Sequence, residues 1–265
     1  MGEKKVRADL LLVERGLAPT REKARALIMA GVVKAGGKRV AKPGDFLSPS
    51  VEISIEEPMP FVGRGGLKLA PALEAFKIDC RDKICLDIGC STGGFTDCLL
   101  QRGARKVYAV DVNINQLDIK LRKDPRVVAM EKNARYLSPG DFPETPDIIT
   151  MDISFISVLK VLPALHDILK EGVLIALLKP QFEAGKGQVG KKGVIKSPEK
   201  HLEIISQVMD KAQALGFRPK SLLASPIKGQ RGNQEFFVLW QKGGHPLSRE
   251  EIMAMVSEVV YGQKN

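Results

Sequence analysis

The sequence predicts an α/β protein in which a mostly parallel sheet carries helices on both faces and follows a small α+β domain. Beyond residue 67, short apolar runs alternate with segments of helical periodicity, which is the pattern of strand–helix–strand units. Several of these runs lack polar alternation, as expected for strands that are buried on both faces. The first 57 residues differ, because their elements are short and strongly basic. With 265 residues and 44% hydrophobic content, the chain can bury a core in each domain.

Residues 1–57 are expected to form the first domain. A helix is predicted over Ala8–Leu17, and a second helix follows Thr20, a residue type that caps helix N-termini. Lys23 stands where a capping box would place Glu, so the box is incomplete. Short strands are expected at Val32–Lys34, Gly37–Val40 and Val51–Ile55.

Positive charge is concentrated in this first domain. The whole chain has a formal net charge of +10, and residues 1–47 hold eleven Lys and Arg against five Asp and Glu. Such a surface suits the phosphate backbone of RNA, although an ordinary solvated helix face would show the same charges. The candidate RNA contacts are Arg7, Arg21, Lys23, Arg25, Lys34, Lys38 and Arg39.

Residues 58–66 are expected to be an interdomain linker, because they contain two prolines and three glycines. The second domain is then expected over residues 67–265, beginning with a helix at Leu67–Phe76. Its predicted strands are Lys83–Asp87, Lys106–Val112, Arg126–Met130, Asp147–Met151, Gly172–Leu178, Ser221–Ser225 and Glu235–Trp240. Its further predicted helices are Gly94–Arg102, Gln116–Arg122, Phe155–Lys170, Pro198–Leu215 and Pro246–Tyr261, the last with a capping box formed by Ser248 and Glu251.

A glycine-rich turn at Asp87–Thr96 joins the first strand of this domain to a helix. That layout presents backbone N–H groups and a helix N-terminus to a ligand. The glycine order departs from the Gly-x-Gly-x-x-Gly pattern of dinucleotide-binding turns. The carboxylate of Asp87 would repel a pyrophosphate but attract the ammonium group of a methionine moiety. The turn therefore favours S-adenosylmethionine, with a dehydrogenase-type dinucleotide as the alternative.

Two further strand ends contribute to this predicted cofactor site. Asp111 ends the second strand, where a carboxylate can accept hydrogen bonds from a ribose, and Asn133 follows the third strand, where it can meet an adenine. The candidate cofactor-binding residues are Asp87, Gly89, Ser91, Thr92, Gly93, Gly94, Phe95, Asp111, Val112, Asn133 and Asp152.

Charged residues also follow the next two strands. Asp152 ends the fourth strand and Lys179 ends the fifth, and ligands of open α/β sheets bind at such carboxyl ends. A lysine directly after a buried strand is costly unless it is paired, so a purely structural ion pair between the two residues is one interpretation. Lys68, in the first helix, and Glu235, at the start of the last strand, add two more charges that a catalytic site could use.

The first domain resembles a known RNA-binding module. Its motifs Arg7-Ala-Asp-Leu-Leu-Leu, Thr20-Arg-Glu-Lys-Ala-Arg and Ile28-Met-Ala-Gly are similar to those of the S4-like RNA-binding domain. The resemblance covers most of residues 6–55 and implies that the basic face of the two helices meets structured RNA.

The second domain resembles the FtsJ type of RNA ribose 2′-O-methyltransferases. The order Lys68, Asp152, Lys179, Glu235 is similar to the Lys-Asp-Lys-Glu tetrad of that family. Together with the S4-like module, residues 6–242 resemble the TlyA family of rRNA methyltransferases, some members of which are labelled hemolysin A. The resemblance implies a Rossmann-like methyltransferase fold with a seven-stranded sheet whose last strand is antiparallel, which would bring Glu235 to the edge that holds Asp152 and Lys179. It also implies S-adenosylmethionine as cofactor and cytidine ribose in ribosomal RNA of one or both subunits as substrate.

The chemistry expected of such a site centres on Lys179. A ribose 2′-hydroxyl must lose its proton as it attacks a methyl carbon. Lys179 would act either as a neutral general base or as a cation that stabilises the developing alkoxide, and the sequence leaves both roles open. Asp152, Lys68 and Glu235 would position Lys179 and the ribose.

Other features bound the remaining alternatives. The four cysteines match no zinc-binding spacing, so no metal site is predicted and the thiols are expected to be reduced. No signal core or membrane-spanning run is visible, which favours a cytoplasmic protein without membrane insertion. A basic glycine-rich loop at residues 185–193 is either a clamp for substrate RNA or simply solvated. A non-catalytic RNA-binding or ribosome assembly factor, and a hemolysin-like membrane-active protein, remain alternatives, and the oligomeric state is open.

Overall fold

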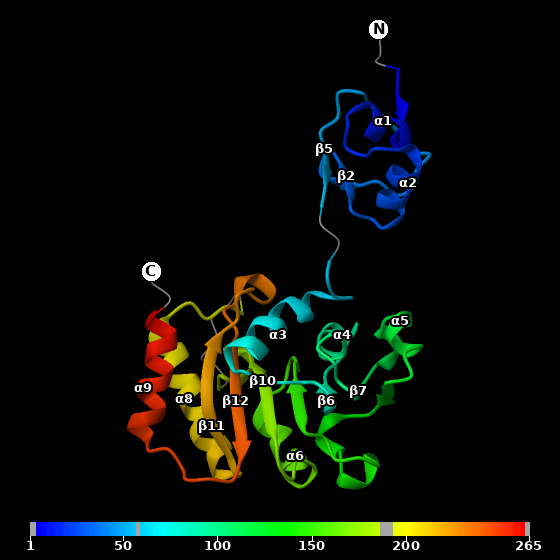
Figure 1. Cartoon of the computed structure of the whole chain (residues 1–265). Coiled ribbons are helices and arrows are strands. Elements are labelled where there is room, and N and C mark those ends of the chain that lie inside the picture. Colours follow the sequence, from blue (N-terminus) through cyan, green and yellow to red (C-terminus); the bar gives the residue numbers. More distant parts are fainter. Residues whose placement is uncertain (1–3, 57–58, 186–192, 263–265) are drawn as a thin grey trace. The chain divides into compact units, whose positions relative to one another are not determined.

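The computed structural model describes residues 4–56, 59–185 and 193–262. The chain divides into two compact units, Met1–Pro60 and Phe61–Asn265 (Figure 1). The greater part of the predicted basic loop at residues 185–193 lies outside the described residues.

The first unit is a small α+β domain with its own core. Its helices are α1 (Ala8–Glu14) and α2 (Arg21–Met29), and its strands are β1 (Val6–Arg7), β2 (Val33–Ala35), β3 (Lys38–Arg39), β4 (Phe46–Leu47) and β5 (Ile53–Ile55). Strand β1 pairs with β4, while β2 pairs with both β3 and β5, and every pair is antiparallel. The Thr20 hydroxyl accepts a hydrogen bond from the backbone N–H of Lys23, as expected of a helix N-cap. Leu12, Ile28 and Val33 are fully buried between the helices and strands.

The second unit is built on a seven-stranded sheet in the order β11-β12-β10-β9-β6-β7-β8. Its strands are β6 (Ile84–Ile88), β7 (Lys106–Asp111), β8 (Val127–Glu131), β9 (Ile148–Met151), β10 (Val173–Leu178), β11 (Phe217–Ala224) and β12 (Phe236–Lys242). The last strand, β12, runs antiparallel to both of its neighbours, β10 and β11. The expected fold class, a mostly parallel sheet with an antiparallel last strand, is therefore confirmed.

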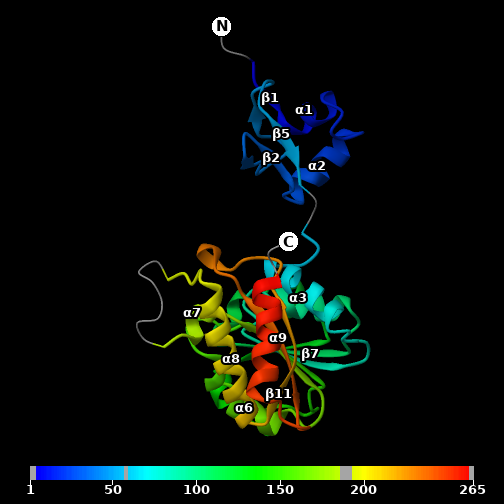
Figure 2. The same cartoon turned by 90° about the vertical axis from the view of Figure 1, so that its left-hand side faces the viewer.

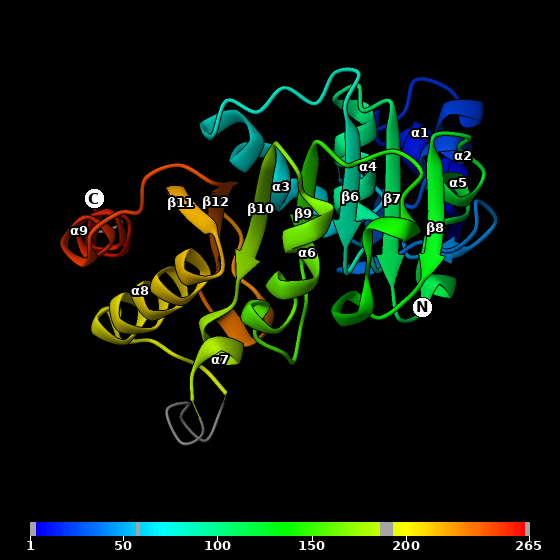
Figure 3. The same ribbon diagram turned by 90° about the horizontal axis from the view of Figure 1, so that it is seen from below.

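Helices cover both faces of this sheet (Figure 3). The α-helices of the unit are α3 (Arg64–Ala75), α4 (Gly94–Gln101), α5 (Ile119–Arg122), α6 (Leu162–Ile168), α7 (Pro180–Glu183), α8 (Pro198–Ala214) and α9 (Arg249–Tyr261). Short 3₁₀ turns are η1 (Ile114–Gln116), η2 (Ala134–Tyr136), η3 (Pro139–Asp141), η4 (Val158–Lys160) and η5 (Gln230–Gly232). Apolar residues of α6, α8 and α9 pack on one face of the sheet, and those of α3 and α4 pack on the other. Figure 2 shows α8 and α9 side by side on their face.

Several predicted helices differ from the observed ones; α1 ends at Glu14 rather than at Leu17, and α9 begins at Arg249 rather than at Pro246. Helix α3 begins at Arg64 rather than at Leu67, and Phe61 and Val62, which were expected in the linker, pack against the core of the second unit. The helix predicted over Phe155–Lys170 is reduced to η4 and α6, because Phe155 has a left-handed backbone (φ +70°) and a proline occupies the first turn of α6. The helix predicted over Gln116–Arg122 is shortened to α5, since Leu117 is extended.

The four cysteines, Cys80, Cys85, Cys90 and Cys98, are buried free thiols, in agreement with the reduced state that the sequence predicts. Burial raises the pKa of the Cys80 thiol to about 11, which keeps it protonated and unreactive near neutral pH. Among the residues that the structure describes, no helix is both long and apolar enough to cross a bilayer.

Candidate active site

Two glycines make the turn after β6 possible. Gly89 has φ +77°, and a Cβ there would lie 2.5 Å from the backbone oxygen of Asp152. Gly93 has φ +97°, and a Cβ there would lie 2.2 Å from Cδ1 of Leu121. A side chain would strain the backbone at both positions because of the positive φ, and at Gly89 it would also collide with the backbone of Asp152. The turn ends at Gly94, where α4 begins.

Asp87, which the sequence predicts to meet the cofactor, is buried and lines neither of the two cavities described below. Its side chain is fully buried, and its carboxylate oxygens accept hydrogen bonds from the hydroxyls of Thr96 (2.7 Å) and Thr150 (3.0 Å). Burial raises the pKa of this carboxyl to about 7. Asp87 lies within β6, where successive side chains point to opposite faces of the sheet. Its side chain therefore points to the face on which the first turn of α4 lies. Its role in the structure is to hold that helix against the sheet.

One cavity lies at the carboxyl ends of β6 and β7 and has a volume of about 410 Å³. The carboxylate of Asp111 accepts hydrogen bonds from the backbone N–H groups of Ser91 (2.9 Å) and Asn113 (3.0 Å), so it fixes one wall. Asn133 accepts a hydrogen bond from the backbone of Arg135, which orients its amide toward the same space. The other lining residues include the apolar side chains of Ile88, Val110, Val112, Ala134, Ile153 and Ile156. A slot with apolar walls, a fixed carboxylate and an oriented amide fits a nucleoside.

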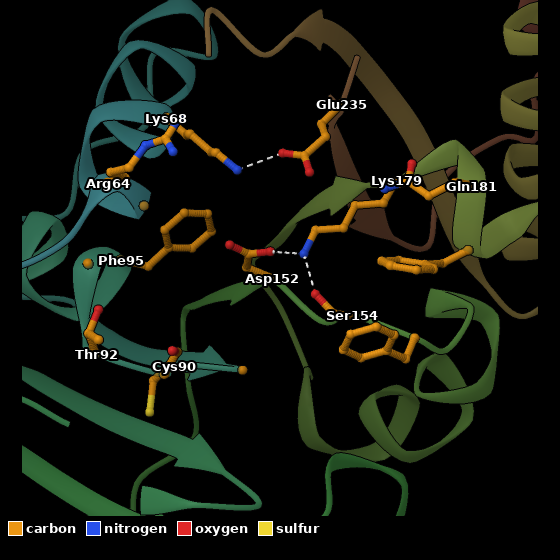
Figure 4. Close-up of a pocket in the computed structure, with 16 residues that line it drawn as sticks. Arg64, Lys68, Cys90, Thr92, Phe95, Asp152, Ser154, Lys179, Gln181 and Glu235 are labelled. Carbon is orange, nitrogen blue, oxygen red and sulfur yellow. Dashed lines mark hydrogen bonds and ion pairs between the residues drawn. The ribbon is translucent and has the colours of Figure 1, made fainter. Parts of the chain in front are cut away.

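A second cavity of similar volume adjoins the first and contains the four charged residues predicted from the sequence (Figure 4). The Nζ atom of Lys68 donates a hydrogen bond to Oε2 of Glu235 at 2.6 Å. The Nζ atom of Lys179 lies 2.6 Å from Oδ1 of Asp152 and donates to the hydroxyl of Ser154 at 2.9 Å. Two ion pairs, both largely shielded from solvent, therefore face one cavity.

The fold explains why these residues meet. Asp152 follows β9 and Lys179 follows β10, and the carboxyl ends of parallel strands lie at one edge of the sheet. Glu235 immediately precedes β12, whose antiparallel direction brings its first residues to that same edge. Lys68 comes from the second turn of α3, whose N-terminus contacts the glycine turn: a Cβ on Gly63 would lie 2.6 Å from the Thr92 hydroxyl.

Burial makes the pairing of these charges necessary. Lys179 is 8% exposed and Glu235 is 3% exposed, and an unpaired charge at such positions would be strongly unfavourable. The ion pair between Lys179 and Asp152 that the sequence suggested as a structural alternative does exist. This pair lines a cavity together with a second ion pair and the hydroxyl of Ser154, so it is also accessible to a ligand.

The structure sorts the predicted cofactor residues into two groups. Asp87 and Gly93 line neither cavity; Gly93 shapes the turn instead. The residues that line one or both cavities are Gly89, Ser91, Thr92, Gly94, Phe95, Asp111, Val112, Asn133 and Asp152.

Several lining residues were absent from the sequence prediction. Ser154 and Phe155 line both cavities, and their place two and three residues after Asp152 was a usable signal, since loops that follow strand ends form such sites. Other residues that the sequence did not single out are Arg64, Gly65, Cys90, Gln181 and Phe182.

The basic residues of the first unit differ in how firmly they are held. Arg7 and Arg21 both donate to the buried carboxylate of Asp9, and these hydrogen bonds lower the pKa of Asp9 to about 2. Lys34 pairs with Glu56 at 2.5 Å. The side chains of Lys23, Arg25, Lys38 and Arg39 are exposed.

Comparison with known proteins places the chain in a family. The model of the FtsJ-like methyltransferase family matches residues 61–242, and the model of the S4 domain matches residues 6–53. The chain belongs to the FtsJ-like methyltransferase family. Enzymes of this family use S-adenosylmethionine, which agrees with the nucleoside-shaped cavity behind the glycine turn.

Relatives that match most of this chain confirm the resemblance to the TlyA family. A Mycobacterium tuberculosis protein named 16S/23S rRNA (cytidine-2′-O)-methyltransferase TlyA is 44% identical over 241 residues, covering 89% of this chain and 90% of that protein. Hemolysin A of Brachyspira hyodysenteriae is 41% identical over 234 residues, covering 87% and 98% of the two chains. A solved structure from Streptococcus thermophilus has a TM-score of 0.74 at 42% identity and covers 99% of this chain and 98% of that one.

Proposed function

We propose that this protein transfers a methyl group from S-adenosylmethionine to the 2′-hydroxyl of a cytidine in ribosomal RNA. The observation that supports the proposal is that the two cavities share lining residues and therefore meet. The nucleoside-shaped cavity and the cavity with the four charged residues share Gly89, Ser91, Asp152, Ser154 and Phe155. A methyl group held near this boundary would lie within reach of a hydroxyl placed beside Lys179.

The cofactor would lie with its adenosine between Asp111 and Asn133 and its methionine part along the turn at Ser91, Thr92 and Gly94. When bound, S-adenosylmethionine supplies an electrophilic methyl group. Asp111 already accepts two backbone N–H groups, so its carboxylate is oriented before a ribose arrives. The small residues Gly89 and Gly94 leave room for the ligand at the backbone.

Lys179 would act on the 2′-hydroxyl. Its contact with the Asp152 carboxylate favours the role of a cation that stabilises the developing alkoxide, because the carboxylate attracts an ammonium group. The hydroxyl proton would pass to the carboxylate of Asp152 as the bond from the 2′-oxygen to the methyl carbon forms. The bond from that carbon to sulfur would break at the same time, and S-adenosylhomocysteine would leave. With Asp152 and Ser154 as partners, an ammonium group keeps a third N–H donor for the substrate. Lys68 and Glu235 would hold the ribose. Because they carry opposite charges, this pair adds no net charge to the cavity.

The first unit would bring the RNA to the enzyme. Exposed Lys and Arg side chains on α2 and β3 suit phosphate contacts, which supply affinity without reading the sequence. We extend the cytidine specificity from the TlyA relative to this chain, and we place the reaction in the cytoplasm, where ribosomes are found. Whether the small subunit, the large subunit or both are modified is decided by the experiment below.

The experiment incubates the protein with isolated small and large ribosomal subunits and S-adenosylmethionine carrying a labelled methyl group. We expect label in RNA of at least one subunit, located at a cytidine whose 3′ bond resists alkaline cleavage. Lys179→Ala should lose more than about 100-fold in rate while it binds S-adenosylhomocysteine normally. Lys170→Ala, which changes an exposed lysine away from both cavities, is the matched control.

Two results would contradict the proposal. If neither subunit accepts label while the cofactor binds, the protein is an RNA-binding factor with an inactive site. If label appears on a base instead of a ribose, the tetrad has been assigned to the wrong chemistry.

A further inference from the structure

Side-chain contacts join the segment that carries Asp152 to the segment that carries Lys179. The first segment is the loop from β9 to η4, residues 152–158, and the second runs from the end of β10 through α7, residues 179–183. Lys179, in the second segment, contacts Asp152 and Ser154 in the first. The aromatic rings of Phe155 and Phe182 also lie close to each other across the two segments, with 5.2 Å between their centroids. Figure 4 shows Lys179 reaching toward Asp152 and Ser154.

Glu183 makes a second set of contacts between these two segments. One of its carboxylate oxygens, Oε2, accepts a hydrogen bond from the Ser157 hydroxyl at 2.5 Å, and the other, Oε1, accepts one from the backbone N–H of Val158 at 3.0 Å. These donors belong to the first residues of η4, so the carboxylate caps that turn. Burial raises the pKa of Glu183, which means that its charge is held in this place at some cost.

Phe155, which lies between Ser154 and Ser157, has an unfavourable backbone conformation. Phe155 has φ +70°, a left-handed conformation that an aromatic residue rarely takes. Such a conformation persists only when the surrounding contacts over-determine it. Ser154, directly before Phe155, is held by Lys179, and Ser157, two residues after it, is held by Glu183. If the contact at Glu183 were lost, the loop could relax and Ser154 would turn away from Lys179.

We propose that Glu183 is a positioning residue that sets the direction of the Lys179 ammonium group by holding the 152–158 loop through Ser157 and Val158. Its contribution to methyl transfer rests on the function proposed above. Its effect on Lys179, in contrast, is a property of the folded protein that can be measured without substrate.

The first measurement is therefore spectroscopic. The protein is labelled with ¹⁵N at lysine side chains, and the Nζ resonance of Lys179 is assigned by its loss in Lys179→Arg. We expect Glu183→Gln and Ser157→Ala to shift this resonance, and Ser157→Thr, which keeps the hydroxyl, to restore most of the shift. Glu144→Gln, which removes a carboxylate that pairs with Arg105 and Lys106 at the other end of the sheet, is the matched control.

The second measurement is kinetic. We expect Glu183→Gln to lower kcat about tenfold, with a melting temperature no lower than that of Glu144→Gln. Glu183→Gln combined with Ser157→Ala should be no slower than the slower of the two single variants, because both changes break one contact. Ser157→Thr should recover most of the rate that Ser157→Ala loses.

The outcomes separate the two proposals. An unchanged Lys179 resonance in folded Glu183→Gln overturns the positioning role, whatever the activity. Additive losses of rate in the double variant also overturn it, since the two residues would then act independently. Shifted resonances in a protein that transfers no methyl group would support the positioning role and refute the proposed function.

Discussion

Lys68 and Glu235 lie 167 positions apart in the sequence, yet Nζ of the lysine donates to Oε2 of the glutamate at 2.6 Å. Their side chains are 12% and 3% exposed, so each charge depends on the other. The pair therefore ties helix α3 to the start of β12 at the edge of the sheet where the cavity opens.

Removing one member of this pair should lower both stability and activity. Glu235→Ala leaves the ammonium group of Lys68 nearly buried and unpaired, and we expect the free energy of unfolding to fall by about 3 kcal/mol. Urea titration followed by circular dichroism measures this change. Lys68→Met combined with Glu235→Leu should recover stability to within about 1 kcal/mol of the wild type, because no charge is left unpaired. Methyl transfer should remain low in the double variant; wild-type activity in the double variant would mean that the pair is purely structural.

Asp111 should govern the affinity for the cofactor. Asp111→Ala removes the carboxylate expected to bind the ribose and also releases the backbone N–H groups of Ser91 and Asn113. We expect S-adenosylhomocysteine to bind about 10- to 100-fold more weakly, in line with the loss of charged hydrogen bonds. Calorimetric titration measures the change. Asp111→Asn keeps one oxygen acceptor and should lose less, while Asp124→Asn, which changes an aspartate outside both cavities, should bind normally. Unaltered binding by Asp111→Ala would place the nucleoside elsewhere.

Asp87 should make stability fall as the pH rises. Its pKa is about 7 in the folded protein against an ordinary value of 3.8, so the folded state binds the proton more tightly than the unfolded state. Between about pH 4 and 7 the folded state therefore holds more protons, and the free energy of unfolding decreases with pH by up to about 1.4 kcal/mol per unit.

Asp87→Asn removes this contribution. The difference in unfolding free energy between variant and wild type, measured by urea titration at pH 5, 6, 7 and 8, should grow in favour of the variant up to about pH 7 and then level off. A difference that does not change with pH would show that the carboxyl titrates near its ordinary range in the folded protein.

Arg25 should contribute to RNA binding through phosphate contact. It lies on α2, one helical turn after Arg21, and its side chain is exposed. Arg25→Gln should weaken binding to ribosomal RNA fragments several-fold and reduce the slope of log K against log salt by about 0.8. Fluorescence anisotropy at several KCl concentrations measures both. Lys211→Gln, which removes an exposed positive charge from α8, should leave the slope nearly unchanged; equal effects of the two changes would point to overall charge instead of a local contact.

Arg7 and Arg21, whose side chains are held by Asp9, should contribute to RNA binding through their fixed positions. Asp9 is fully buried and accepts hydrogen bonds from both Arg7 and Arg21. Asp9→Ala adds no positive side chain but frees both guanidinium groups, and we expect RNA affinity to fall because their fixed spacing is lost. The same anisotropy assay tests this, and an increase in affinity would show that Asp9 competes with phosphate for the arginines.

The sequence predicted all seven strands of the sheet, and the inner strands most clearly, because burial on both faces makes each of them a short apolar run. The edge strand β11 was predicted only from Ser221 onward, because its first half contains Arg218, Pro219 and Lys220. The long helices α8 and α9 were predicted for a similar reason, since their apolar faces repeat over several turns. The short elements were predicted less well. Helix α7 has four residues, and Phe155 has a left-handed backbone that no local pattern reveals.

What the sequence determined by itself was which charged residues stand at the ends of strands. The predicted strands placed Asp111, Asp152 and Lys179 at one edge, since parallel strands end together, and the family resemblance added Lys68 and Glu235. The tertiary structure decided which partner each charge has: Lys179 meets Asp152 and Ser154, Lys68 meets Glu235, and Asp87 turns inward to two threonines. The physical reason is that a strand end is fixed by local burial, whereas the direction of a side chain depends on neighbours that come from distant parts of the chain.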